Sequence, residues 1–131
     1  MAKQGKVVLI VEDDIPIAEM YAAELSLSGF TVEVANDGQA GLLAAVQKKP
    51  DIILLDILLP EMDGYDVLKK LKGDEKTRTI PVLLLSNLSQ PEQIDRGKQL
   101  SAIDYLVKAN HVPADIVERI ETFFGSPAPN H

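Results

Sequence analysis

The sequence predicts an α/β fold in which a parallel sheet is covered by helices on both faces. Three observations predict it: five short apolar runs, helical patterns between these runs, and a length of 131 residues, which suits a single domain. Apolar residues make up 46% of the chain and charged residues 25%, a globular composition that excludes wholesale disorder. Strands that alternate with helices are typical of a doubly wound sheet with right-handed crossovers.

The five apolar runs are the predicted strands. Four of them are nearly continuous in Val, Ile and Leu, which predicts strands buried on both faces. The run at residues 31–35 instead alternates polar and apolar side chains, which indicates an edge strand with one wet face. The predicted strands are Val7–Val11, Thr31–Ala35, Ile52–Leu55, Val82–Leu85 and Ile103–Val107.

The segments between the strands carry helical spacing and helix signals. Asp37 is a plausible N-cap, Pro113 suits a first helical turn, and Gly125 suits a helix end. The helix after Pro91 is the least apolar. The predicted helices span residues 15–28, 37–48, 63–73, 91–100 and 113–124. Five such units predict one flavodoxin-like domain with a core over about residues 5–125 and a disordered tail at 126–131.

Charge and composition exclude several function classes. The net charge of −7 makes the chain a poor candidate for direct contact with nucleic acid or an anionic membrane. The absence of cysteine excludes disulfides, thiolate zinc sites and cysteine nucleophiles, and suits a cytoplasmic location. A spanning helix needs about 20 apolar residues, and the sequence has no such run.

Polar residues follow the predicted strands at the end of the sheet where doubly wound folds bind ligands. Glu12, Asp13 and Asp14 follow the first strand, and Asn36 and Asp37 follow the second. Asp56, Ser86 and Lys108 follow the third, fourth and fifth strands. If the strand order is 2-1-3-4-5, Glu12, Asp13, Asp56, Ser86 and Lys108 converge on one crevice. Asp14 is not among them, because we expect it to cap the helix that begins at Ile15.

The convergent residue types suit phosphoryl transfer. Crowded carboxylates raise one another's pKa, and a divalent cation relieves their repulsion. Oxygen ligands with few protein donors favour Mg²⁺. Lys108 adds a positive charge, Ser86 adds a hydroxyl group, and a carboxylate can accept phosphoryl as an aspartyl phosphate. A lone Asp after a strand is more often a loop residue or a helix cap, so the interpretation depends on the joint pattern.

The motifs resemble those of the receiver domain of two-component response regulators. The resemblance covers about residues 5–125 and rests most strongly on the pattern Asp-x-x-x-Pro-x-Met-Asp-Gly at residues 56–64. Further matches are Leu9–Asp14, Pro81–Ser86 and Asp104–Lys108. The resemblance implies a single receiver domain over residues 1–131, with a five-stranded parallel sheet in the order 2-1-3-4-5.

The resemblance also implies a role for each site residue. Asp56 is the expected phosphoryl acceptor, Lys108 pairs with a phosphoryl oxygen, and Ser86 bonds another phosphoryl oxygen and takes part in the switch. Tyr105 matches the aromatic switch residue, although on composition alone it is an ordinary aromatic of an edge strand. The implied Mg²⁺ ligands are Asp13, Asp56 and the backbone carbonyl of Leu58, with Glu12 acting through water.

The implied function is that of a stand-alone, cytoplasmic response regulator. Its phosphoryl donor is a sensor histidine kinase or a histidine phosphotransfer protein, and its output is a protein target bound by the face of the fourth helix, fifth strand and fifth helix. It is a phospho-acceptor that assists its own phosphorylation and slow dephosphorylation, not a turnover enzyme. The alternative is a receiver-like interaction module that is never phosphorylated.

The sequence departs from the family's usual residues at several positions. Ala109 follows Lys108 where a proline is usual, often after a cis bond. A cis bond before a residue other than proline costs about 2.5–4 kcal/mol, so this loop is either strained or trans. Asn87 replaces a smaller residue and is expected to narrow access to the phosphoryl group. Leu58 and Leu88 replace polar residues, which predicts slow hydrolysis. Ser101 stands where Gly is common.

Two other enzyme or binding classes fit the sequence less well. Aspartate-nucleophile hydrolases of the haloacid-dehalogenase type use a second acid two residues after the nucleophile, and that position holds Leu58. A nucleotide-binding domain would show a glycine-rich phosphate loop after its first strand, and Glu12-Asp13-Asp14 stands there instead.

Overall fold

The computed structural model describes residues 5–125, so the tail at 126–131, for which we expected disorder, lies outside the described residues. Five parallel strands form one sheet in the order β2-β1-β3-β4-β5, which confirms the expected topology. The strands are β1 (Val7–Val11), β2 (Thr31–Ala35), β3 (Ile52–Leu55), β4 (Val82–Ser86) and β5 (Asp104–Val107). The helices are α1 (Ile15–Leu27), α2 (Gly38–Lys48), α3 (Gly64–Gly73), α4 (Pro91–Gln99) and α5 (Pro113–Phe123), with a short 3₁₀ turn at Lys108–Asn110.

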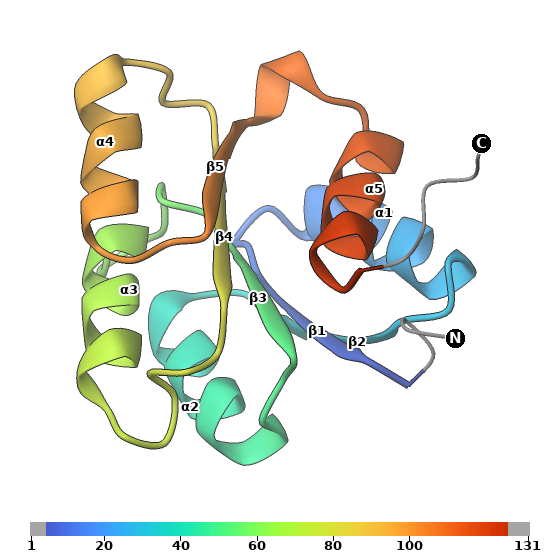
Figure 1. Ribbon diagram of the computed structural model, residues 1–131, viewed down its shortest axis with the longest axis horizontal. Helices are drawn as coiled ribbons and strands as arrows, with labels where there is room; N and C mark the ends of the chain where they lie inside the picture. Colours follow the sequence, from blue (N-terminus) through green and yellow to red (C-terminus); the bar gives the residue numbers. More distant parts are fainter. Residues whose placement is uncertain (1–4, 126–131) are drawn as a thin grey trace.

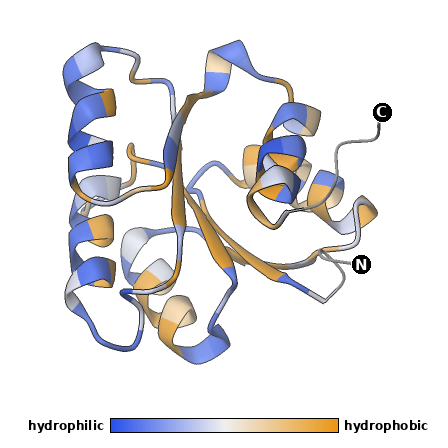
Figure 2. Ribbon diagram, viewed as in Figure 1, coloured by the Kyte–Doolittle hydropathy of each residue, from blue (hydrophilic) through white to orange (hydrophobic). Residues whose placement is uncertain are grey.

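Helices cover both faces of the sheet (Figure 1): α2, α3 and α4 lie on one side, and α1 and α5 on the other. Successive strand residues point to opposite faces, so each strand serves two cores. Leu9 and Val11 of β1 belong to the core under α2, α3 and α4, whereas Val8 and Ile10 belong to the core under α1 and α5. Figure 2 shows largely hydrophobic strands and helices that carry both hydrophilic and hydrophobic residues.

Local signals in the sequence placed most element ends correctly. Asp14, Asp37 and Asp63 are the N-caps of α1, α2 and α3, and each carboxylate accepts a backbone N–H from the first helical turn. The edge strand β2 is partly exposed, as its alternating pattern predicted. Among residues 5–125, no helix is both long enough and apolar enough to cross a membrane.

Small differences occur at the end of the sheet that carries the polar residues. Strand β4 extends through Ser86, because Ser86 pairs in register with Val107 of β5. The 3₁₀ turn at Lys108–Asn110 was not expected from the sequence. No peptide bond among the described residues is cis, so the loop after Lys108 is trans, the second of the two possibilities at Ala109.

Candidate functional site

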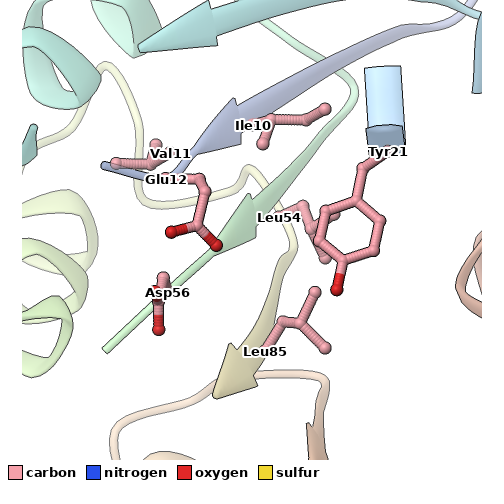
Figure 3. A pocket seen from close by; sticks show the side chains of 7 residues that line it. All are labelled: Ile10, Val11, Glu12, Tyr21, Leu54, Asp56 and Leu85. Carbon is pink, nitrogen blue, oxygen red and sulfur yellow. The ribbon is translucent and has the colours of Figure 1, made fainter. Parts of the chain in front are cut away.

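Two buried carboxylates lie side by side at the carboxyl ends of β1 and β3 (Figure 3). Glu12 directly follows β1 and Asp56 directly follows β3, and only 2% and 6% of their surfaces are exposed. Their backbones continue the strand pairing by one residue. The N–H of Glu12 donates to the carbonyl of Ala35 at 3.0 Å, and that of Asp56 donates to the carbonyl of Val11 at 3.0 Å. The sheet itself therefore fixes where both carboxylates lie.

A third carboxylate completes an acidic cluster. Carboxylate oxygens of Glu12, Asp13 and Asp56 all lie within 4.8 Å of one another, and Asp13 is the exposed member. Oxygen ligands around a small space that is open to water on one side fit Mg²⁺, which retains several of its waters. The N–H of Leu58 donates to Oδ1 of Asp56 at 3.2 Å, so the turn after β3 folds back on this carboxylate. The Leu58 carbonyl stays a predicted ligand.

Lys108 places a positive charge against the two buried carboxylates. Its Nζ lies 2.5 Å from Oε1 of Glu12 and 3.0 Å from Oδ2 of Asp56, and 12% of its side-chain surface is exposed. Burial alone would lower the pKa of Lys108, but the hydrogen bond to Glu12 and the charge of Asp56 raise it above its ordinary value. Lys108 is therefore a fixed cation that reaches across the end of β4 to both acids.

Glu12 is buried beside a small pocket with mostly apolar lining, which disfavours its charged form. Burial is the main reason that the pKa of Glu12 rises from 4.5 to about 7, and the charge of Asp56 adds to it while the hydrogen bond from Lys108 opposes it. The space beneath is too small for a water molecule. Its lining is Ile10, Val11, Glu12, Tyr21, Leu54, Asp56 and Leu85 (Figure 3).

Ser86 and Tyr105 meet at the loop between β4 and α4. The Ser86 side chain is fully buried, and its Oγ accepts a hydrogen bond from the N–H of Leu88 at 3.3 Å. Tyr105 donates its hydroxyl to the carbonyl of Leu88 at 2.5 Å. Although β5 is an edge strand, Tyr105 is buried, and this burial raises the pKa of its hydroxyl. Both side chains therefore hold Leu88, and Leu88 also packs against the core under α4.

The predicted site residues thus form two neighbouring groups. Lys108 contacts both Glu12 and Asp56, and a carboxylate oxygen of Asp13 lies within 4.8 Å of those of the two other acids. Ser86 and Tyr105 are joined through Leu88 on the adjacent loop. Leu58, with 55% of its surface exposed, lies at the mouth of the site.

Sequence reasoning missed three side-chain contacts beside the site. The hydroxyl of Tyr65 donates to the carbonyl of Gln93 in α4 at 2.6 Å, and the guanidinium of Arg96 lies 4.2 Å from its ring centre. Burial raises the pKa of Tyr65 to about 12. Asn87 accepts a hydrogen bond from the N–H of Ala109 at 3.0 Å. The only available signal for this last contact was that β4 and β5 are neighbours in the expected order.

Comparison with known proteins decides the family. Residues 8–121 match the family described as the response regulator receiver domain. This chain belongs to that family. Response regulators belong to two-component signalling systems. The family assignment therefore excludes the haloacid-dehalogenase-type hydrolase and the nucleotide-binding domain as families for this chain.

Individual relatives agree with this assignment. The chain is 40% identical over 113 residues to the DNA-binding dual master transcriptional regulator RpaA of Synechocystis, an alignment that covers 86% of this chain and 45% of that protein. The chain spans about half the length of the curated relatives it matches. These relatives are thus longer than this receiver-sized chain.

Solved structures of other receivers have the same fold. The chemotaxis protein CheY4 of Vibrio cholerae aligns with a TM-score of 0.84 at 30% identity, covering 90% of this chain and 98% of that one. The receiver domain of the sensor histidine kinase PA1611 of Pseudomonas aeruginosa, described with magnesium in its active-site cleft, aligns with a TM-score of 0.82 at 27% identity. That alignment covers 93% of this chain and 99% of the other.

Proposed function

We propose that this receiver accepts a phosphoryl group on Asp56 from a phosphohistidine of a sensor histidine kinase or of a histidine phosphotransfer protein. The observation that carries the proposal is the contact of one lysine with two buried acids: Lys108 bonds both Asp56 and Glu12. Asp56 is buried enough to be shielded from bulk water, yet it lies beside the exposed Asp13, on the side from which a donor can approach.

The residues present fit Mg²⁺. Asp13 and Asp56 would hold the ion with the Leu58 carbonyl, and Glu12 would act through a bound water. The ion would supply positive charge to the oxygens of the phosphoryl group as it transfers. The donor set supports this assignment, because all of its atoms are oxygens and two of its acids would repel each other when both are charged.

The chain's own side chains would do the remaining work. An Asp56 oxygen attacks phosphorus as the bond from phosphorus to the donor imidazole breaks, and the imidazole leaves with that electron pair. Lys108 already contacts Oδ2 of Asp56, so its ammonium is placed to pair with a phosphoryl oxygen on that carboxylate. The Ser86 hydroxyl would bond a second oxygen after a shift of the end of β4 and the loop that follows it.

Phosphorylation would then change the face made by α4, β5 and α5. A phosphoryl group adds about −1.5 to −2 charge and strong hydrogen-bond acceptors. If it draws Ser86 toward it, the Oγ of Ser86 leaves the N–H of Leu88, and Leu88 is also the residue that Tyr105 holds. The β4–α4 loop and Tyr105 would move together, and a protein target would recognise the changed face.

The chain would act as a phospho-acceptor that recovers slowly, not as a turnover enzyme. Leu58 at the mouth of the site offers no side chain that could orient an attacking water, so slow loss of the phosphoryl group stays a prediction. A cytoplasmic location for the reaction is supported by the relative RpaA, which is named as a DNA-binding regulator and would act where the DNA lies. The competing candidate, a receiver-like module that is never phosphorylated, is favoured only by the unusual Ala109.

Intact-mass analysis after incubation with a small phosphoramidate tests the proposal. We expect one added phosphoryl group in wild type with Mg²⁺, and none without Mg²⁺ or in Asp56→Asn. The matched control is Asp95→Asn on the exposed side of α4, which should label like wild type. An unlabelled wild type, under conditions that label a known receiver, would favour the interaction module. Labelling of the Asp56→Asn variant would mean that a residue other than Asp56 accepts the phosphoryl group.

A further inference from the structure

We propose that Asn87 is a positioning residue that holds the turn Lys108–Asn110, and through it the Lys108 ammonium, in place for phosphoryl transfer. The inference rests on the proposed function, since it assigns Asn87 a part in the same reaction. Its starting point is one hydrogen bond between two loops that are 22 residues apart in the chain: Oδ1 of Asn87 accepts the N–H of Ala109 at 3.0 Å.

The sheet brings these two loops together. Strands β4 and β5 are paired in parallel up to Ser86 and Val107, which lie opposite each other. Asn87 and Lys108 are the next residues on the two strands, where the regular backbone pairing ends. The carboxamide of Asn87 therefore continues the connection between the strands by one step, with a side-chain oxygen in place of a backbone carbonyl.

The turn after β5 has no side-chain acceptor of its own for its first N–H groups, and Asn87 supplies one from outside the turn. The first N–H groups of any helical turn have no partner inside the turn. Here the residue before the turn is Val107, whose side chain cannot accept a hydrogen bond, and no side chain of its own caps the turn. Within the turn, the N–H of His111 bonds the carbonyl of Lys108 at 3.3 Å, but the N–H of Ala109 points to Asn87. Asn87 thus caps the turn from the neighbouring strand.

Capping this turn matters because Lys108 is its first residue. The Lys108 side chain spans the end of β4 to reach Glu12 and Asp56, and a shift of its backbone moves the ammonium away from both acids. A lysine side chain has many rotamers, so a mobile backbone would spread its charge over several positions. An N–H bonded to Asn87 restricts the turn to one arrangement.

Asn87 also joins the two loops that the proposed reaction uses. It directly follows Ser86, the last residue of β4, whose hydroxyl accepts the N–H of Leu88 on the loop that Tyr105 also holds. The same residue is bonded to the loop of Lys108. The two loops are therefore tied at one point, so that displacement of Ser86 is transmitted to the turn that carries Lys108. From the sequence alone, we expected the Asn87 side chain to narrow access to the phosphoryl group. In the structure, the same side chain connects the two loops.

The first test reads the contact directly and needs no phosphorylation. We expect amide hydrogen exchange at Ala109, measured by NMR, to be slowed in wild type and in Asn87→Asp, which keeps an acceptor oxygen. The exchange should speed up by about threefold to tenfold in Asn87→Ala, as befits one exposed hydrogen bond. Asn110→Ala is the matched control, since it removes an exposed asparagine side chain from the same turn. An Ala109 exchange rate that is equal in wild type and Asn87→Ala would overturn the inference.

The second test asks whether the contact serves the reaction. With a small phosphoramidate, Asn87→Ala should label about threefold to tenfold more slowly than wild type. The Mg²⁺ concentration for half-maximal labelling should change less than about twofold, because Asn87 touches none of the expected ligands. In an Ala109→Pro background, where residue 109 has no N–H, adding Asn87→Ala should change the rate less than about twofold.

The outcomes distinguish the positioning role of Asn87 from the proposed phosphorylation of Asp56. A wild type that labels normally, beside an Asn87→Ala variant that labels equally fast, overturns the positioning role and leaves the proposed function standing. An equal effect of Asn87→Ala in the wild-type and Ala109→Pro backgrounds also overturns it, because Asn87 would then act through another contact. A wild type that never labels overturns the proposed function, and the positioning role falls with it.

Discussion

Helices α1 and α4 end in the same backbone motif but are held to the sheet in different ways. The first turn of α1 is capped by Asp14, and its buried residues are Ala18, Tyr21 and Leu25. In α4 the N-cap residue Gln90 makes no side-chain cap bond, and Gly97 is the only buried residue. Apolar packing therefore anchors α1, whereas the one apolar side chain that α4 packs against the core, Ile94, is only partly buried.

Besides this partial packing, α4 is held by a small set of directional contacts from its neighbours. Tyr65 of α3 bonds the carbonyl of Gln93, and Arg96 lies over the ring of Tyr65. Tyr105 of β5 bonds the carbonyl of Leu88 just before the helix. A hydrogen bond contributes about 1 kcal/mol, and its donor can bond another acceptor or water instead. A buried leucine that leaves the core loses the free energy of its burial without such a replacement. The contrast teaches that α4 is the element that a signal at the site can move at low cost.

The largest expected effect comes from removing an anchor of α1. Leu25→Ala takes a side chain with 1% exposure out of the core and leaves a cavity, so the free energy of unfolding in urea should fall by about 2–5 kcal/mol. The control is Leu27→Ala in the same helix, where 84% of the surface is exposed and the change should stay within about 0.5 kcal/mol. Equal losses in both variants would mean that packing does not anchor α1.

The same contrast explains how far the sequence could predict the structure. Strands and helix starts depended on local signals, such as the run Val7–Val11 and the cap Asp14, so their positions were predicted well. The strand order came from the family resemblance, and with it the convergence of Glu12, Asp56 and Lys108. The charge pattern then indicated the chemistry, because each acid or base directly follows a strand.

Contacts between side chains and distant backbone groups could not be predicted in this way. The bond from Tyr65 to Gln93 depends on the distance between α3 and α4, which no local pattern encodes. The bond from Ala109 to Asn87 depends on a trans peptide and an unexpected turn. The sequence identified Asn87 and Ala109 as unusual residues, but only the packed sheet brings them into contact.

A smaller effect is expected from adding a methyl group inside α4. A Cβ on Gly97 would lie 2.5 Å from Cδ1 of Leu84 and 3.3 Å from Cδ2 of Tyr105. Overpacking costs about 1–3 kcal/mol, and alanine regains about 1 kcal/mol of helix propensity, so Gly97→Ala should lower the free energy of unfolding by about 1 kcal/mol. We also expect the NMR ring signals of Tyr105 to shift, because its ring must move.

Gly73→Ala at the end of α3 is the matched control for this variant. A Cβ there meets nothing within 4 Å, so alanine should leave the Tyr105 signals unchanged and should not destabilise the chain. If Gly97→Ala left Tyr105 in place as well, then α4 would be free to adjust without moving the predicted switch residue Tyr105, and the coupling inferred from its few contacts would be wrong.

The smallest effect is expected at the shared end motif. In α1 the N–H of Phe30 bonds the carbonyl of Leu25 and Gly29 has φ 100°, whereas in α4 the N–H of Ala102 bonds the carbonyl of Gly97 and Ser101 has φ 73°. Only glycine adopts this left-handed region without strain, so Ser101 weakens the end of a helix that is already poorly anchored. Ser101→Gly should raise the free energy of unfolding by about 0.5 kcal/mol, since relief of strain exceeds the added entropy of the unfolded chain.

The reverse exchange in α1 shows whether strain or anchoring decides the difference. Gly29→Ser should cost about 0.5 kcal/mol in the urea unfolding free energy, because it introduces the same strained residue into the same motif. Hydrogen exchange of α4 amides should slow in Ser101→Gly, while α1 amides should stay protected in Gly29→Ser because Leu25 still packs in the core. If α1 lost protection as readily as α4 gains it, the helix ends would govern local stability. The apolar anchors of α1 would then not be what distinguishes the two helices.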